Sequence, residues 1–256
     1  VAHHSVLVVE VFGSIDKTRQ EIQFQYGADE HRLVKEMLDI RDNLGKVNKL
    51  EAFHDALERK EDAHQMFTLG VLELPEKAKI ETLYWEISKE VVQSFRGQAY
   101  VPEEIRHLED SLGDQYLCNF SVFQSLLDHW ALGQLFPVMP VHRLLERPTR
   151  EGTLVDITCD SDGCINKFVD LRDVRDTLPL HELRETPQGQ EPYYLGFFLM
   201  GAYQDIMGDL HNLFGRVNEV HVFLEPDEPC GYYVEEVIEG NTISQCLTSE
   251  IGRAHV

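Results

Sequence analysis

The sequence lacks three features that would assign it to a class at once. No apolar run approaches the roughly 20 residues that a membrane-spanning helix needs, so we expect no membrane partner. The five cysteines are an odd number without metal-type spacing, which favours free thiols in a reducing compartment. No internal repeat and no low-complexity tract is present. These absences favour a globular protein of the cytoplasm.

Basic residues are also scarce. The chain has 23 Lys and Arg against 45 Asp and Glu, for a formal net charge of -22. A surface of this sign repels nucleic acid and anionic membranes, so we expect neither as a partner. The 256 residues, 43% of them hydrophobic, suffice for one or two domains with a packed core.

Both ends of the sequence indicate a longer gene. The chain begins with Val1 instead of Met, and Glu250 to Val256 (EIGRAHV) resemble the translation of a common sequencing adapter. We expect residues 250–256 to be an artefact and leave them out of the fold prediction.

The first half of the chain predicts one strand and then a helical region. Val6 to Phe12 (VLVVEVF) is a short apolar run stopped by Gly13, which is typical of a buried parallel strand. From Asp29 to Gly113, apolar residues recur at helical spacing among charges. Short connections between the predicted helices indicate an antiparallel bundle. The four helices begin near Leu33, Leu50, Pro75 and Pro102, prolines being favoured in a first turn.

From Tyr116 the apolar period changes to two, which predicts strands. Pro137 and Pro140 make the second of these an edge strand or an irregular segment. Several short strands at this spacing indicate a β-sandwich or a barrel. The predicted strands are Tyr116–Phe123, Gln134–Leu144, Gly152–Cys159, Cys164–Val169, Tyr193–Met200, Val217–Leu224 and Tyr232–Ile238.

Two short runs in this second half carry candidate chemistry. Thr158 to Gly163 (TCDSDG) follows a strand, and its Asp-Ser-Asp-Gly is typical of a type I turn. Cys159 and Asp160 should therefore stand at a strand end, where side chains can point into a cleft. The run Gly201 to Gln204 (GAYQ) closes another strand and enters a predicted helix, 204–213.

These runs carry a resemblance to a known family. The order strand, Cys-Asp turn, strand and Gly-Ala-Tyr resembles the C-terminal β-domain of pyridoxal-phosphate decarboxylases with the alanine-racemase fold. Longer runs resemble the biosynthetic arginine decarboxylases among them: YLCNFSVFQSL, QLFPVMPVHRL, TLVDITCDSDG, LGFFLMGAYQDIMGDLHNLFG and EVHVFL.

The resemblance implies an α+β fold and a domain order. Residues 1–27 would hold the last strand of a (β/α)8 barrel and a linker, residues 28–115 a helical-bundle insertion, and residues 116–249 a C-terminal β-sandwich or barrel domain. It also implies conversion of L-arginine to agmatine and carbon dioxide in polyamine biosynthesis, with pyridoxal 5'-phosphate and Mg²⁺. We can place no Mg²⁺ ligand.

The same resemblance implies roles for five residues. Cys159 would return a proton to the substrate after carbon dioxide leaves. Asp160, with Asp162 as a weaker second, would pair with the guanidinium, because a carboxylate can accept two hydrogen bonds from that group. Tyr203 would bind the cofactor phosphate, and Gly201 would let the backbone approach it closely.

The family also implies a homodimer or homotetramer whose active sites are shared between subunits. The Schiff-base Lys would lie upstream of Val1, so the 256 residues alone should be inactive.

Other interpretations stand beside these. A free Cys is usually a small buried hydrophobe, Asp160 and Asp162 suit a turn by themselves, and Tyr203 could fill a core. A decarboxylase for another basic amino acid and a non-catalytic, partner-binding relative are the functional alternatives. Ornithine is disfavoured, because ornithine-type relatives have an Asp where this chain has Phe120.

Overall fold

The computed structural model describes residues 3–16, 23–95, 98, 100–171, 174–201, 203–208 and 210–251. The chain divides into two units, one made of Val1–Ser14 with Gln115–Val256 and the other of Ile15–Asp114. The mixture of helices and strands agrees with the predicted α+β class. None of the described helices combines the length and the apolar character needed to cross a membrane. All five cysteines are free.

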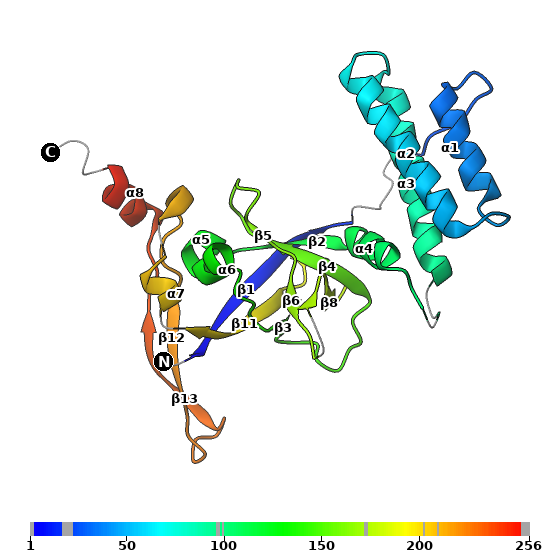
Figure 1. The fold of residues 1–256 in the computed structure, drawn as a ribbon. Coiled ribbons are helices and arrows are strands. Elements are labelled where there is room, and N and C mark those ends of the chain that lie inside the picture. Colours follow the sequence, from blue (N-terminus) through cyan, green and yellow to red (C-terminus); the bar gives the residue numbers. More distant parts are fainter. Residues whose placement is uncertain are drawn as a thin grey trace. The chain divides into compact units, whose positions relative to one another are not determined.

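The described residues of the Ile15–Asp114 unit form four helices, as the apolar spacing predicts. Helices α1, α2 and α3 lie side by side (Figure 1). Asn48 caps α2, since its Oδ1 accepts a hydrogen bond from the Leu50 amide at 2.9 Å. The bounds are α1 (Arg32–Asn43), α2 (Lys49–Thr68), α3 (Leu74–Phe95) and α4 (Glu103–Ser111).

The core of this unit consists of the residues that recur every three or four positions. The predicted stripe of α3 is buried at Ile80, Leu83, Tyr84, Ile87 and Val91. It packs against buried side chains from the other three helices. The charged residues of α3 are partly or fully exposed, which is the usual arrangement of an amphipathic helix.

The other unit is built on a seven-stranded sheet. Its strand order is β3-β11-β1-β2-β4-β5, and β8 pairs with β4. Three further strand pairs, β6 with β7, β9 with β10 and β12 with β13, lie outside this sheet. The sheet strands are β1 (His3–Ile15), β2 (Asp114–Cys118), β3 (Val138–Pro140), β4 (Arg150–Val155), β5 (Cys164–Ile165), β8 (Leu178–Leu180) and β11 (Tyr193–Gly201).

Short elements complete this unit. The paired strands outside the sheet are β6 (Phe168–Val169), β7 (Val174–Arg175), β9 (Glu185–Thr186), β10 (Gly189–Gln190), β12 (Glu219–Leu224) and β13 (Tyr232–Ile238). The helices are α5 (Val122–Ser125), α6 (Leu127–Leu132), α7 (Tyr203–Ile206), the 3₁₀ turn η1 (His211–Leu213) and α8 (Ile243–Ile251).

Strand β1 exists as predicted, but its predicted parallel pairing is wrong. It runs antiparallel to β11, with Val9 opposite Leu195 and Val11 opposite Tyr193. These four side chains are buried, whereas Val8, which precedes Val9, is exposed. Alternate residues of a strand point to opposite faces. The continuous apolar run therefore comes from apolar residues on both faces, and not from a strand enclosed between helices.

Two other predictions fail in the same unit. The strand predicted for 116–123 ends at Cys118, and its last residues form α5. The helix predicted for 204–213 is replaced by α7 and η1. Asn212 adopts a left-handed conformation, with φ 56° and ψ 24°, which ends a right-handed helix. The predicted edge position of the proline-containing strand is correct, since β3 lies at the edge of the sheet.

Candidate functional site

The Cys-Asp turn lies where strand β4 has ended. The amide of Gly163 donates to the carbonyl of Asp160 at 3.0 Å, which closes the predicted four-residue turn. The amide of Asp162 donates to Asp160 Oδ1, also at 3.0 Å. Cys159, Asp160 and Asp162 are all exposed on this unit. The interpretation of Cys159 as a buried packing residue is therefore wrong.

Beneath the turn lies a buried carboxylate that sequence reasoning did not select. Asp156 is only 4% exposed. Its Oδ1 accepts hydrogen bonds from the Thr158 amide at 2.9 Å and the Thr158 hydroxyl at 2.7 Å. Its Oδ2 accepts from the Val122 amide at 2.9 Å. The available signal was an Asp between Val155 and Ile157 in an otherwise apolar strand.

Side chains from α6 and η1 contact the exposed part of the turn. The Trp130 indole Nε1 donates to Asp162 Oδ2 at 3.0 Å. Asn212 Nδ2 lies 4.0 Å from Cys159 Sγ. The ring of Phe123 packs against both Trp130 and His211, at centroid distances of 5.0 and 4.4 Å. The turn and the segment that follows Gly-Ala-Tyr are thus brought together.

The second predicted run places Tyr203 at an accessible position. Strand β11 ends at Gly201 and α7 begins at Tyr203, whose side chain is 57% exposed. The interpretation of Tyr203 as a core residue is therefore wrong. The neighbouring Gln204 is buried and bonds Asp128 of α6, both through its Nε2 and by accepting from the Asp128 amide. Ala202 lies outside the described residues.

Phe120, the residue that disfavours ornithine, packs inside this unit. It is buried, and its ring lies 5.4 Å from that of Phe197. The preceding Asn119 is held by β1, because its Oδ1 accepts from the Glu10 amide at 2.7 Å. The carbonyl of Phe120 accepts from the Ile157 amide at 3.1 Å. This segment therefore runs beside the start of the Cys-Asp turn.

A second cysteine shows the contrast between a packing thiol and Cys159. Cys118 is fully buried at the end of β2. Burial disfavours the thiolate and raises the pKa of Cys118 to about 12. That thiol stays protonated throughout the physiological range and is part of the core.

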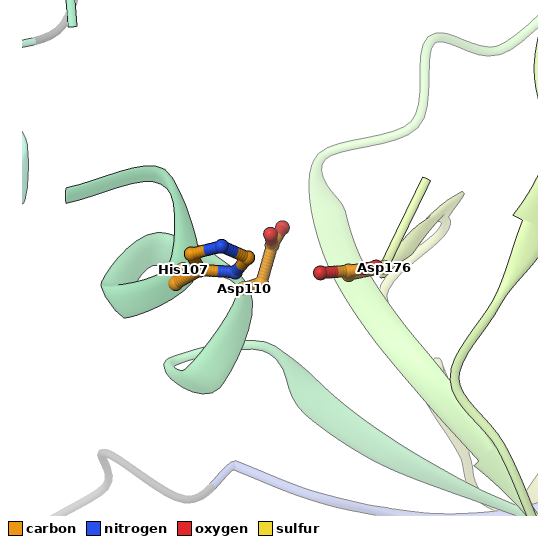
Figure 2. Close-up of side chains that lie close together, drawn as sticks. All are labelled: His107, Asp110 and Asp176. Atoms are coloured by element: carbon orange, nitrogen blue, oxygen red, sulfur yellow. The ribbon is translucent and has the colours of Figure 1, made fainter. Parts of the chain in front are cut away.

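The described part of each unit was searched for groups of side chains that could hold a metal ion. Figure 2 shows His107 and Asp110 on α4 and Asp176 of the other unit. The Asp176 carboxylate accepts a hydrogen bond from Lys167. Among the described residues, neither unit alone brings together three His, Cys, Asp or Glu ligand atoms. Magnesium stays a prediction of the resemblance, and we place no ligand for it among the described residues.

Comparisons with known proteins agree on one family. Residues 27–109 match the family described as "Arginine decarboxylase helical bundle domain". The chain is 46% identical over 246 residues to the biosynthetic arginine decarboxylase of Phocaeicola vulgatus, which covers 96% of this chain and 38% of that protein. It is 48% identical over 229 residues to that of Deinococcus radiodurans, covering 88% of this chain and 34% of the relative.

A solved structure supports the same similarity. The crystal structure of the biosynthetic arginine decarboxylase from Campylobacter jejuni superposes with a TM-score of 0.76 at 32% identity. The alignment covers 97% of this chain and 38% of that one. The chain therefore spans less than two fifths of the length of each of these three relatives.

Proposed function

Because this chain is a homologue of the biosynthetic arginine decarboxylases over 96% of its length, we propose that it is the C-terminal part of such an enzyme. The enzyme converts L-arginine to agmatine and carbon dioxide for polyamine biosynthesis. The observation that carries the proposal is this homology, which extends through both units and includes the exposed Cys159–Asp160 turn. The Schiff-base Lys would be supplied by the part of the protein that this chain does not include.

The unit that contains the seven-stranded sheet suits a phosphate-bearing cofactor in one respect. Tyr203 exposes its side chain at the start of α7, two residues after Gly201, so its hydroxyl is accessible to a phosphate oxygen. Helix α7 has four residues, too few to add the dipole contribution of a long helix. Pyridoxal 5'-phosphate, when bound, supplies the electron sink for the cleaved carbon–carbon bond.

The Cys-Asp turn would act on the two ends of the substrate. Cys159 holds a proton and delivers it to the carbon that has lost carbon dioxide. Asp160 receives the guanidinium. One of its oxygens already accepts from the Asp162 amide, but a carboxylate oxygen has two lone pairs, so a two-bond contact stays possible. Asp162 is the weaker partner, since Trp130 already donates to its Oδ2.

The test is a substrate panel on the full-length enzyme, encoded by the complete reading frame that contains this chain. Arginine, ornithine, lysine and diaminopimelate are supplied in turn, and carbon dioxide and amine products are measured by mass spectrometry. We expect agmatine from arginine and little product from the others. Preference for another amino acid would replace the assignment with a different decarboxylase. A complete gene without a Schiff-base Lys would favour a non-catalytic relative.

Substitution of Tyr203 tests the cofactor contact. Tyr203→Phe in the full-length enzyme should weaken pyridoxal-phosphate binding by roughly 1–2 kcal/mol, because one hydrogen bond to a charged group is lost. Fluorescence titration of the apoenzyme measures the change. Tyr194→Phe, a matched change on β11, the strand that leads to Tyr203, should leave the affinity unaltered. Equal affinity of Tyr203→Phe and wild type would make Tyr203 a structural residue.

A further inference from the structure

Asp156 joins two segments that are 34 residues apart in the sequence. Its Oδ1 holds the turn, through the amide and hydroxyl of Thr158, and its Oδ2 holds the first amide of α5, at Val122. Cys159 follows Thr158 directly. The Asp156 carboxylate therefore fixes the position of the Cys159 segment relative to α5.

Three donors around one side chain require a carboxylate. A carboxylate offers two oxygens that both accept. An amide offers one oxygen and one NH₂, so an Asn at position 156 would direct a donor at a donor in either orientation. A buried polar group that loses its partner is costly. The arrangement is thus specific for Asp.

The turn closes directly over this carboxylate. A Cβ added at Gly163 would lie 2.1 Å from Asp156 Oδ1 and 2.7 Å from Thr158 Oγ1. Real Cβ atoms do not approach other atoms so closely, so only a hydrogen fits there. The Asp156 amide also donates to the Gly163 carbonyl at 2.8 Å. Both ends of the turn are therefore tied to Asp156.

We propose that Asp156 is the positioning residue of the decarboxylase site: its carboxylate holds the Cys159–Asp160 turn in place against α5. This inference rests on the proposed function, and Asp156 itself touches no substrate. Its effect is expressed through the placement of the Cys159 thiol and the Asp160 carboxylate. Proton delivery is sensitive to such placement, since a displacement of about 1 Å can cost on the order of 100-fold in rate.

The first test compares two buried carboxylates in the full-length enzyme. Asp156→Asn should lower kcat for arginine by roughly 10- to 100-fold at saturating cofactor. Asp114→Asn changes a buried Asp at the start of β2. It should lower the melting temperature without lowering kcat of the folded enzyme. A kcat of folded Asp156→Asn equal to wild type would overturn the proposal.

The second readout does not depend on activity. Cys159 and Cys230 are both exposed, and Cys230 lies in the β12–β13 loop, so it serves as an internal reference. Iodoacetamide labelling followed by mass spectrometry gives the ratio of their alkylation rates. Asp156→Asn should change this ratio and Asp114→Asn should not. An unchanged ratio in Asp156→Asn would contradict the proposal even if the wild-type enzyme proved inactive on arginine.

A variant of Gly163 perturbs the same contact from the other side. Gly163→Ala should lower kcat as Asp156→Asn does, because the new methyl group displaces the carboxylate. Combined with Asp156→Ala, which removes that carboxylate, Gly163→Ala should add little further loss, since the two changes act on one contact. Fully additive losses would mean that the two residues act independently and would overturn the proposal.

Discussion

Mixing two inactive full-length variants is expected to restore about a quarter of wild-type activity, because active sites shared by a two-fold dimer can complement each other. One variant is Cys159→Ala and the other lacks the Schiff-base Lys. Half of the randomly formed dimers are mixed, and one of the two sites in a mixed dimer has both an intact Lys and an intact Cys159. The motivating observation is that Cys159 is exposed on the surface of its own unit.

Each homodimer is the control and should be nearly inactive alone. Native mass spectrometry establishes that mixed dimers have formed. Activity that stays at the homodimer level, with mixed dimers present, would place Cys159 in the active site of its own chain. Recovery after mixing would support the proposal that the turn acts on the partner subunit.

Removal of the Asp160 carboxylate should reduce activity on arginine more than activity on citrulline, the uncharged isostere. A charge-assisted contact left unpaired costs on the order of 2–4 kcal/mol. We therefore expect kcat/KM for arginine to fall by roughly 30- to 1,000-fold in Asp160→Ala. Steady-state kinetics with both substrates measures the difference.

A matched variant separates this contact from general electrostatic attraction. Asp170→Ala removes an equal charge from another exposed position of the same unit, and it should leave kcat/KM for arginine near the wild-type value. Equal losses for arginine and citrulline in Asp160→Ala would remove Asp160 from the specificity role. Asp162→Ala should have a smaller effect than Asp160→Ala, since Trp130 already donates to Asp162.

Local chemistry made part of the fold predictable. The α3 stripe from Ile80 to Val91 is buried as its spacing predicts. Pro75 and Pro102 mark helix starts, since Pro75 lies in the first turn of α3 and Pro102 occupies the N-cap position of α4. The turn at Asp160–Gly163 was predictable because its residue types suit a type I turn, which the hydrogen bond from the Gly163 amide to the Asp160 carbonyl closes.

Tertiary contacts decided what the sequence did not reveal. Val122 begins a helix because a distant carboxylate accepts its amide hydrogen, and no local pattern signals that bond. Strand β1 alternates between a buried and an exposed face although both faces are apolar. Asp156 was visible only as an acid in an apolar strand. Its three donors are known only once the turn and α5 are placed in space.

A structure of the full-length enzyme with bound agmatine would test the central claim most directly. We predict that the guanidinium lies within hydrogen-bonding distance of the Asp160 carboxylate. We also predict that Cys159 Sγ of the same chain faces the carbon that carried the carboxylate, and that both residues enter the site from the partner subunit. Agmatine bound away from the turn, or Cys159 directed into solvent in the occupied enzyme, would contradict the account.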